Sequence, residues 1–227
     1  MAIRPVFVVS TDKKFVKKEN IEFKFFNGFS AVQKKRSINN LHYEYLRNNK
    51  GKKILEISSK SDNDIGLKLS AFNLMIKTKN GKEFSVESAF QSSKVFENGG
   101  PYKDLLYKPS KKSKLDSRLK NSGRIIKFKF NEQFYETEPK TFFYNWLYIN
   151  ALNLHDDLTD ELIKFDAFTD IEFNPTKSIN CQAEAAAIYV SLRKQNLIKD
   201  ALANSDSFKK IVYQLDSYEA EQMNFFD

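Results

Sequence analysis

Short stretches in which apolar and polar residues alternate, and short apolar runs, recur along the first two thirds of the chain. Patterns of this length are typical of β-strands that have one buried face. Asn80-Gly81 is a turn signal between two of them. The predicted strands cover residues 4–9, 21–26, 54–58, 69–77, 83–84 and 125–130.

Longer stretches, with apolar residues three or four positions apart, predict helices. Ser30 and Asn180 are suitable N-caps for the first and the last of them. The stretch TFFYNWLYINAL is apolar on every side, which is typical of a helix in the centre of a domain. Gly99-Gly100-Pro101 is expected to end the second helix. The predicted helices cover residues 30–47, 86–96, 141–152, 157–164 and 181–194.

The chain shows no internal repeat and no clear linker, so we predict a single α+β domain that is mostly helical, with a small sheet. Its 227 residues are 41% hydrophobic and 14% aromatic. This composition is sufficient for a packed core. We expect residues 1–203 to form this domain. Residues 204–227, which end in an acidic and aromatic segment, are expected to pack on the domain or on a partner.

The formal net charge of +8 is compatible with a polyanionic partner such as nucleic acid, and equally with a lysine-rich surface. Residues 108–120 (KPSKKSKLDSRLK) are the most basic stretch. They are interpreted either as a contact to a nucleic-acid backbone or as a surface loop.

Several classes of site are disfavoured by composition. The single cysteine, Cys181, excludes an internal disulfide framework, and we expect it to be a small core residue. The two histidines, His42 and His155, make histidine-centred catalysis and metal sites unattractive. The acidic residues at 156–161 fit the first turn of a helix better than a metal site. No signal peptide and no apolar run of about 20 residues is present, so we expect a cytoplasmic protein without membrane contact.

The predicted helix over residues 86–96 carries three chemically useful side chains. At about 100° per residue, Glu87, Gln91 and Lys94 share one side of such a helix. A carboxylate there can act as a general acid or base, and a partly desolvated lysine has a lowered pKa and becomes a nucleophile. From spacing alone, the simpler interpretation is the solvated side of an amphipathic helix.

The sequence around this helix changes that interpretation. LSAF at residues 69–72, followed by SVESAFQSSKVF at residues 85–96, resembles the NADAR (YbiA-like) family, whose members carry an LSNF element and a TVEHYFQAQKF helix. Ala71 and Ser88 depart from this pattern, because the family has Asn and His there. Further stretches, from RPVFV to AFTDIEFNPTKSINCQAEAAAIYVSL, resemble the NADAR antitoxins that are paired with DarT-type DNA ADP-ribosyltransferases.

The resemblance implies removal of ADP-ribose from guanine bases of DNA, with ADP-ribose as the product and without a metal or other cofactor. The cognate toxin is a further expected partner. We expect Lys94 to form a Schiff base with the sugar and Glu87 to carry protons. Asp170 is expected to be the second carboxylate, with Glu172 as the alternative.

Five further residues are expected to contact the substrate. Gln91 and Asn180 are suited to hydrogen bonds with the ribose, and Asn180 lies at a helix start, where phosphate is favoured. Phe72 and Trp146 either stack on a base or pack in the core. Ser70 belongs to the LSAF element and is expected beside them.

Two other functions remain open. YbiA-like proteins are also linked to hydrolysis of an N-glycosidic bond in phosphoribosyl pyrimidine intermediates of riboflavin synthesis. Alternatively, the protein is a non-catalytic antitoxin that neutralises a toxin by binding it, for which the acidic tail and the basic first helix would be suited.

Overall fold

A four-stranded mixed sheet forms one end of the molecule. The computed structural model describes residues 1–28 and 30–214. Strands β1 (Ala2–Val9) and β2 (Val16–Phe23) form an antiparallel hairpin. Strand β9 (Ala167–Thr169) pairs antiparallel with β1 and parallel with β3 (Ile54–Glu56), so the strand order is β2-β1-β9-β3. The central position of β9 brings the segment that follows it, including Asp170, into the middle of the molecule.

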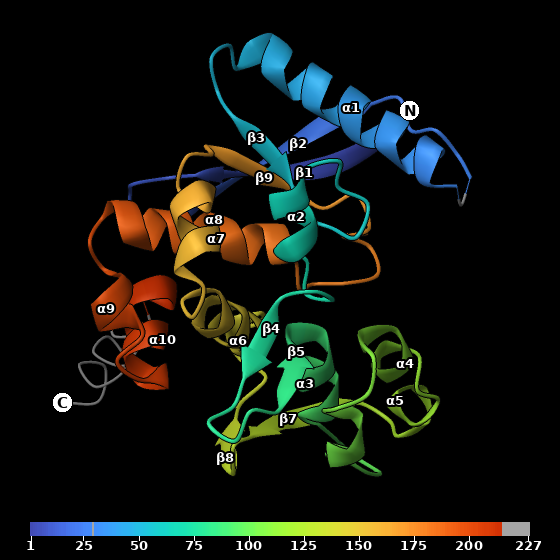
Figure 1. Ribbon diagram of the computed structural model, residues 1–227, viewed down its shortest axis with the longest axis vertical. Coiled ribbons are helices and arrows are strands. Elements are labelled where there is room, and N and C mark those ends of the chain that lie inside the picture. Colours follow the sequence, from blue (N-terminus) through green and yellow to red (C-terminus); the bar gives the residue numbers. More distant parts are fainter. Residues whose placement is uncertain (29, 215–227) are drawn as a thin grey trace, which may run out of the picture.

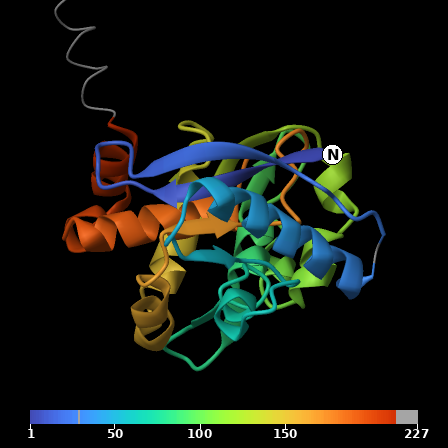
Figure 2. The same cartoon turned by 90° about the horizontal axis from the view of Figure 1, so that it is seen from above.

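Helices cover both faces of this sheet because successive strand residues point to opposite sides. Val6 packs with Leu41 and Tyr45 of helix α1 (Ala31–Asn48). Its neighbour Phe7 belongs to the larger core, together with helix α8 (Gln182–Lys194). Figures 1 and 2 show α1 along the outer side of the sheet and α8 on its inner side. As predicted, α1 begins after Ser30, whose hydroxyl accepts a hydrogen bond from the Gln33 amide.

Helix α6 (Phe142–Leu152) lies at the centre, as its apolar composition predicts, and nine of its residues are buried. It contacts α8, α3 (Val86–Ser92) and α10 (Ser205–Tyr213). In Figure 1 it lies between the four-stranded sheet and the second group of strands. The two halves of the molecule therefore share one hydrophobic core.

The second half is built from short elements. Strands β6 (Lys94–Phe96), β7 (Ile125–Phe130) and β8 (Gln133–Tyr135) form an antiparallel sheet, and β4 (Met75–Lys77) pairs with β5 (Glu83–Ser85). Phe128 of β7 stacks on Phe143 of α6 at 4.6 Å between ring centroids, which fixes this sheet to the central helix. The connection from β6 to β7 contains η1 (Lys103–Leu105), α4 (Ser110–Lys114) and α5 (Arg118–Asn121).

The architecture is a mixture of helices and small sheets, compatible with the predicted α+β class, but the described residues form three sheets rather than one. The remaining helices are α2 (Asp64–Lys68), α7 (Asp156–Leu162) and α9 (Ile198–Ala201). Asp156 and Asp157 lie in the first turn of α7, as expected. From the predicted tail, the described part forms α10, whose Phe208 packs on Phe142; residues 215–227 lie outside the described residues.

The predicted strand over residues 69–77 is wrong for its first six positions. Only residues 75–77 are a strand. Before them the chain turns, because the Ser70 carbonyl accepts hydrogen bonds from the amides of both Asn73 and Leu74 at 2.8 Å. This turn forms part of the wall of the candidate site.

Candidate active site

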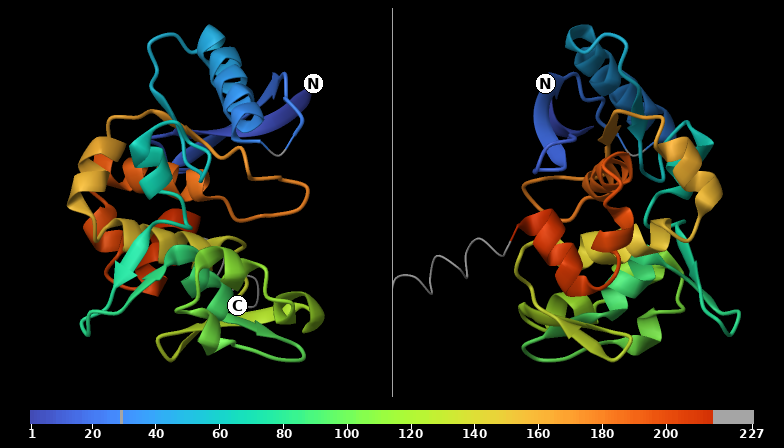
Figure 3. Two further views of the ribbon diagram at one scale, coloured as in Figure 1. Left: turned by 45° about the vertical axis from the view of Figure 1, so that its right-hand side comes forward. Right: turned by 90° about the vertical axis from the view of Figure 1, so that its left-hand side faces the viewer.

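A cavity of about 1020 Å³ opens between the two halves of the molecule. This volume is enough for a nucleotide-sized ligand. The cavity wall combines α3, β6, α4, α6 and the loop between β9 and α8. In the left view of Figure 3 this loop projects to the same side of the molecule as α4 and α5. Seven of the eight predicted site residues line the cavity: Ser70, Phe72, Glu87, Gln91, Lys94, Asp170 and Asn180.

Helix α3 is shorter than predicted. Ser85 is its N-cap, with its hydroxyl accepting from the Ser88 amide at 3.0 Å, and the helix ends at Ser92 rather than Phe96. The hydroxyls of Ser92 and Ser93 both donate to the Ala89 carbonyl, a contact that competes with helix continuation. Lys94 therefore starts strand β6, where it pairs with Phe128 of β7.

Although Lys94 is not helical, it still meets Glu87 and Gln91. The Gln91 amide donates through Nε2 to Glu87 Oε1 at 2.9 Å and accepts through Oε1 from Lys94 Nζ at 2.7 Å. Glu87 and Gln91 are buried, with 5% and 6% exposure. The predicted proximity of the three side chains is confirmed, but it arises from a helix followed by a turn into a strand. We refer to Glu87, Gln91 and Lys94 as the relay.

Lys94 is in a setting that favours its neutral form. Burial lowers the pKa of Lys94 to about 8, and the positive charge of Lys114 acts in the same direction, while Glu87 opposes both. Its Nζ lies 4.7 Å from the centre of the Phe90 ring. About a tenth of this amine is therefore unprotonated at pH 7, far more than for an ordinary lysine, and a nucleophilic lysine requires the neutral form.

Across the cavity, Asp170 is held by groups that the sequence pattern did not identify. Gln182 donates through Nε2 to Asp170 Oδ2 at 3.0 Å and to the Ile57 carbonyl at 2.7 Å. Its Oε1 accepts from the Ala71 amide at 2.6 Å, so Gln182 joins the LSAF turn to the second carboxylate. A long-range contact of this kind leaves no signal in sequence spacing.

A buried carboxylate, Glu56, lies behind Asp170. Glu56 Oε2 accepts from the Thr169 hydroxyl at 2.6 Å, and Oε1 accepts from the Ile171 amide at 2.8 Å. Desolvation and the negative charge of Glu56 raise the pKa of Asp170 above its ordinary value. His42 Nε2 lies 2.8 Å from the same Thr169 hydroxyl, and burial lowers the pKa of His42 to about 4, which keeps the ring neutral.

The alternative carboxylate, Glu172, differs from Asp170 in its environment. Although it also lines the cavity, its side chain is 42% exposed and pairs with Lys34 of α1 at 3.1 Å. Asp170 is less exposed, is held by Gln182 and faces the charge of Glu56. These differences make Asp170 the carboxylate better suited to hold a proton.

The sequence comparison decides the family. A model of the DarT1-associated NADAR antitoxins matches residues 2–222. The chain belongs to this family. No curated protein matches it. Antitoxins of this family are associated with a DarT-type toxin, so a toxin is a partner that the family assignment supports.

Two positions where this NADAR chain departs from the general motif have structural roles here. Ala71 is buried and uses its backbone, since its carbonyl accepts from the Glu87 amide at 2.9 Å. Ser88 donates to the Lys108 carbonyl at 2.9 Å and so attaches the basic stretch to α3.

Of the two remaining predicted substrate contacts, Asn180 lies in the cavity wall that residues 1–28 and 30–214 form, and Trp146 does not. Trp146 packs on Phe208 at 5.4 Å and is absent from the cavity wall formed by the described residues, so the structure favours its core interpretation. Asn180 lines the cavity but is not the N-cap of α8, which is Cys181. Cys181 is buried, as expected.

The basic stretch forms α4 and α5 and places Lys114 and Lys120 in the cavity wall. In residues 1–28 and 30–214, no group of three or more His, Cys, Asp or Glu side chains is arranged to hold a metal ion. Within the same residues, no helix has both the length and the hydropathy needed to cross a membrane.

Proposed function

We propose that this NADAR antitoxin is an N-glycosidase that removes ADP-ribose from guanine bases of DNA and so reverses the action of a DarT-type toxin. The observation that carries the proposal is the relay: a partly buried amine with a lowered pKa, connected through one amide to a buried carboxylate at a nucleotide-sized cavity. This arrangement is suited to covalent catalysis by lysine.

The proposed reaction starts with opening of the ribose. Asp170 in its protonated form donates a proton to the ring oxygen as the bond from this oxygen to the anomeric carbon breaks, which leaves a C=N bond between that carbon and the guanine nitrogen. The neutral amine of Lys94 adds to the anomeric carbon, and Glu87 accepts the proton that the amine loses.

The second half of the reaction releases the base and then the sugar. Glu87 returns its proton to the guanine nitrogen as the bond from this nitrogen to the anomeric carbon breaks, which leaves a Schiff base on Lys94. Water adds to the Schiff base, the carbon–nitrogen bond to Lys94 breaks, and ADP-ribose recloses its ring. One water is consumed overall, and Lys94, Glu87 and Asp170 return to their starting states.

The charge and size of the cavity support a substrate that carries phosphates. Besides Lys94 and Lys114, three lysines lie in its wall: Lys120, Lys140 and Lys177. Ammonium groups are suited to the diphosphate of ADP-ribose and to the DNA backbone. Phe72 offers a ring at the cavity surface, on which a base can stack.

We extend the proposal to the organisation of the chain. Residues 1–203 form one catalytic domain with a YbiA-like fold, and residues 204–227 pack on it. The contacts of Phe208 with Phe142 and Trp146 support this for the part of the segment that is described.

The test is restoration of a guanine-containing oligonucleotide that has been ADP-ribosylated by a DarT-type enzyme, followed by mass spectrometry. We expect the wild type to release ADP-ribose, and Glu87→Gln to be slower by about 100-fold, because it removes the proton carrier but keeps the shape. Glu161→Gln, an exposed change on α7, should retain full activity.

Two further measurements separate the alternatives. Turnover of phosphoribosyl pyrimidines without turnover of modified DNA would favour the riboflavin-related activity. If the Glu87→Gln, Lys94→Ala double variant still protects cells from the toxin, antitoxin action rests on binding and not on catalysis.

A further inference from the structure

Lys114, from the basic stretch, reaches the relay from a separate element. Its Nζ lies 3.7 Å from Glu87 Oε1, the same oxygen that accepts the hydrogen bond from Gln91. It also lies 5.1 Å from the centre of the Phe72 ring. Two lysines therefore flank one buried carboxylate, Lys94 through the Gln91 amide and Lys114 directly.

Hydrogen bonds of serines hold α4, which carries Lys114, against the start of α3 and against η1. Ser110 Oγ contacts the Phe72 carbonyl at 2.8 Å and Ser85 Oγ at 2.7 Å. Ser88 donates to the Lys108 carbonyl, and Ser113 donates to the Leu105 carbonyl at 2.8 Å. These contacts fix the backbone of α4, and the half-exposed side chain of Lys114 extends from it to Glu87.

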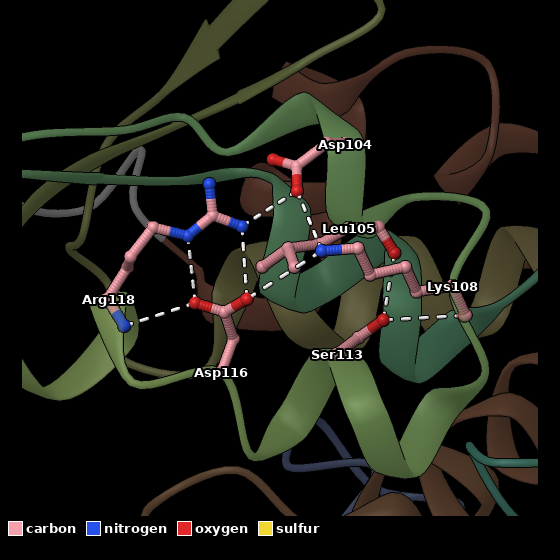
Figure 4. Close-up of polar contacts among 6 residues, drawn as sticks. All are labelled: Asp104, Leu105, Lys108, Ser113, Asp116 and Arg118. Carbon is pink, nitrogen blue, oxygen red and sulfur yellow. Dashed lines mark hydrogen bonds and ion pairs between the residues drawn. The ribbon is translucent and has the colours of Figure 1, made fainter.

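A cluster of four charged side chains connects the residues that precede α4 with those that follow it. Arg118 contacts Asp116 through Nε at 2.8 Å and Nη2 at 3.0 Å, and Asp104 at 2.7 Å; Lys108 contacts Asp104 at 2.8 Å. Figure 4 shows these four side chains facing one another, beside the hydrogen bonds of Ser113. Their two positive and two negative charges satisfy one another. Lys114 is not part of this cluster and pairs with Glu87.

We propose that Lys114 is the positioning residue of the relay: its ammonium group holds the Glu87 carboxylate beside Gln91 and offsets, at Lys94, the negative charge of Glu87. The inference rests on the proposed function, because it assigns Lys94 a reaction that needs a neutral amine. Without Lys114, Lys94 would face Glu87 alone, and an unopposed carboxylate favours an ammonium ion.

The surroundings of Lys94 support this assignment. From α3 it faces the negative charge of Glu87, and from α4 the positive charge of Lys114. Tyr144 of α6 is buried, which raises its pKa far above the ordinary value, so it is neutral. The raised pKa of Asp170, across the cavity, reduces its negative charge near neutral pH. Lys114 is therefore the charge that offsets Glu87.

The experiment measures the protonation of Lys94 directly, by pH-dependent acetylation of the full chain with acetic anhydride and mass spectrometry of the Lys94 peptide. In Lys114→Met we expect the labelling midpoint to rise by about one pH unit, since one nearby positive charge is lost. Lys114→Arg should keep the wild-type midpoint. Lys111→Met removes the same charge from an exposed position on the same helix and should also leave it unchanged.

Release of ADP-ribose from modified DNA is followed in parallel. Lys114→Met should be about tenfold slower near neutral pH and recover at higher pH, as expected for a one-unit shift. An unchanged labelling midpoint in Lys114→Met, or a loss of rate that is equal at every pH, would overturn the inference. If the wild type releases no ADP-ribose, the proposed function fails, while the labelling midpoints still decide the role of Lys114.

Discussion

The Gln91 amide makes two hydrogen bonds in opposite directions, donating to Glu87 and accepting from Lys94. Such an arrangement orients both partners at once, because the amide cannot reverse without losing both bonds. Sequence spacing placed these three side chains together. It could not show that Lys94 leaves the helix, because the break depends on the side-chain bonds of Ser92 and Ser93 and on pairing with β7.

At the residue scale, we predict that Gln91→Leu lowers both stability and activity. The change leaves the buried Glu87 without one donor, which costs about 1–3 kcal/mol of unfolding free energy. The rate of ADP-ribose release should fall by about tenfold, because an unmade hydrogen bond of about 1.4 kcal/mol corresponds to that factor. Urea denaturation and the DNA assay measure the two effects.

Gln195→Leu is the matched control for Gln91→Leu. This substitution also removes an amide hydrogen bond, from Gln195 Nε2 to Ser191 Oγ at 3.0 Å. Gln195 lies at the end of α8, outside the cavity wall formed by the described residues. It should alter stability alone. Wild-type activity in Gln91→Leu would show that Glu87 and Lys94 act without this amide.

At the scale of elements, the sequence predicts single helices and strands better than their ends. The boundaries of α1, α6 and β7 agree closely with the hydrophobic pattern. α1 begins at a clear cap, and α6 is buried over most of its length. The apolar residues at 69–74 predict a strand, yet the backbone bonds there and the contact from Gln182 require a turn. Contacts to distant residues therefore override the local pattern there.

Helix α4 provides a prediction at this scale. Ser110→Ala removes the contacts of its hydroxyl with the Phe72 carbonyl and with Ser85. The loss should lower the free energy of unfolding by about 1–2 kcal/mol. Loosening α4 should also raise the acetylation midpoint of Lys94, because Lys114 is held less firmly beside Glu87.

Ser117→Ala is the control for this change. Ser117 is exposed and, in the part of the chain that the structure describes, makes no side-chain capping bond to α5. The effect of the substitution on the free energy of unfolding should therefore stay within about 0.5 kcal/mol. If Ser110→Ala behaves like Ser117→Ala in both measurements, the serine contacts do not position Lys114.

At the scale of the whole molecule, the cavity lies where segments that are far apart in the sequence meet. The α+β class, the central helix and most cavity residues could be predicted, since they follow from local pattern and family motifs. The parallel pairing of β9 with β3 and the contact of Gln182 with Ala71 could not, because both join residues more than 100 positions apart. Gln182 was missed for this reason, and Lys114 because its contact with Glu87 joins two separate elements.

The central claim is that Lys94 bonds covalently to the sugar during turnover, and borohydride trapping tests it most directly. The wild type is mixed with ADP-ribosylated DNA near pH 8, where about half of the Lys94 amine is neutral, and is reduced during the reaction. Peptide mass spectrometry should find reduced ADP-ribose on Lys94, and Lys94→Ala should give neither this adduct nor product. Full activity in Lys94→Ala, with no adduct on the wild type, would contradict the account.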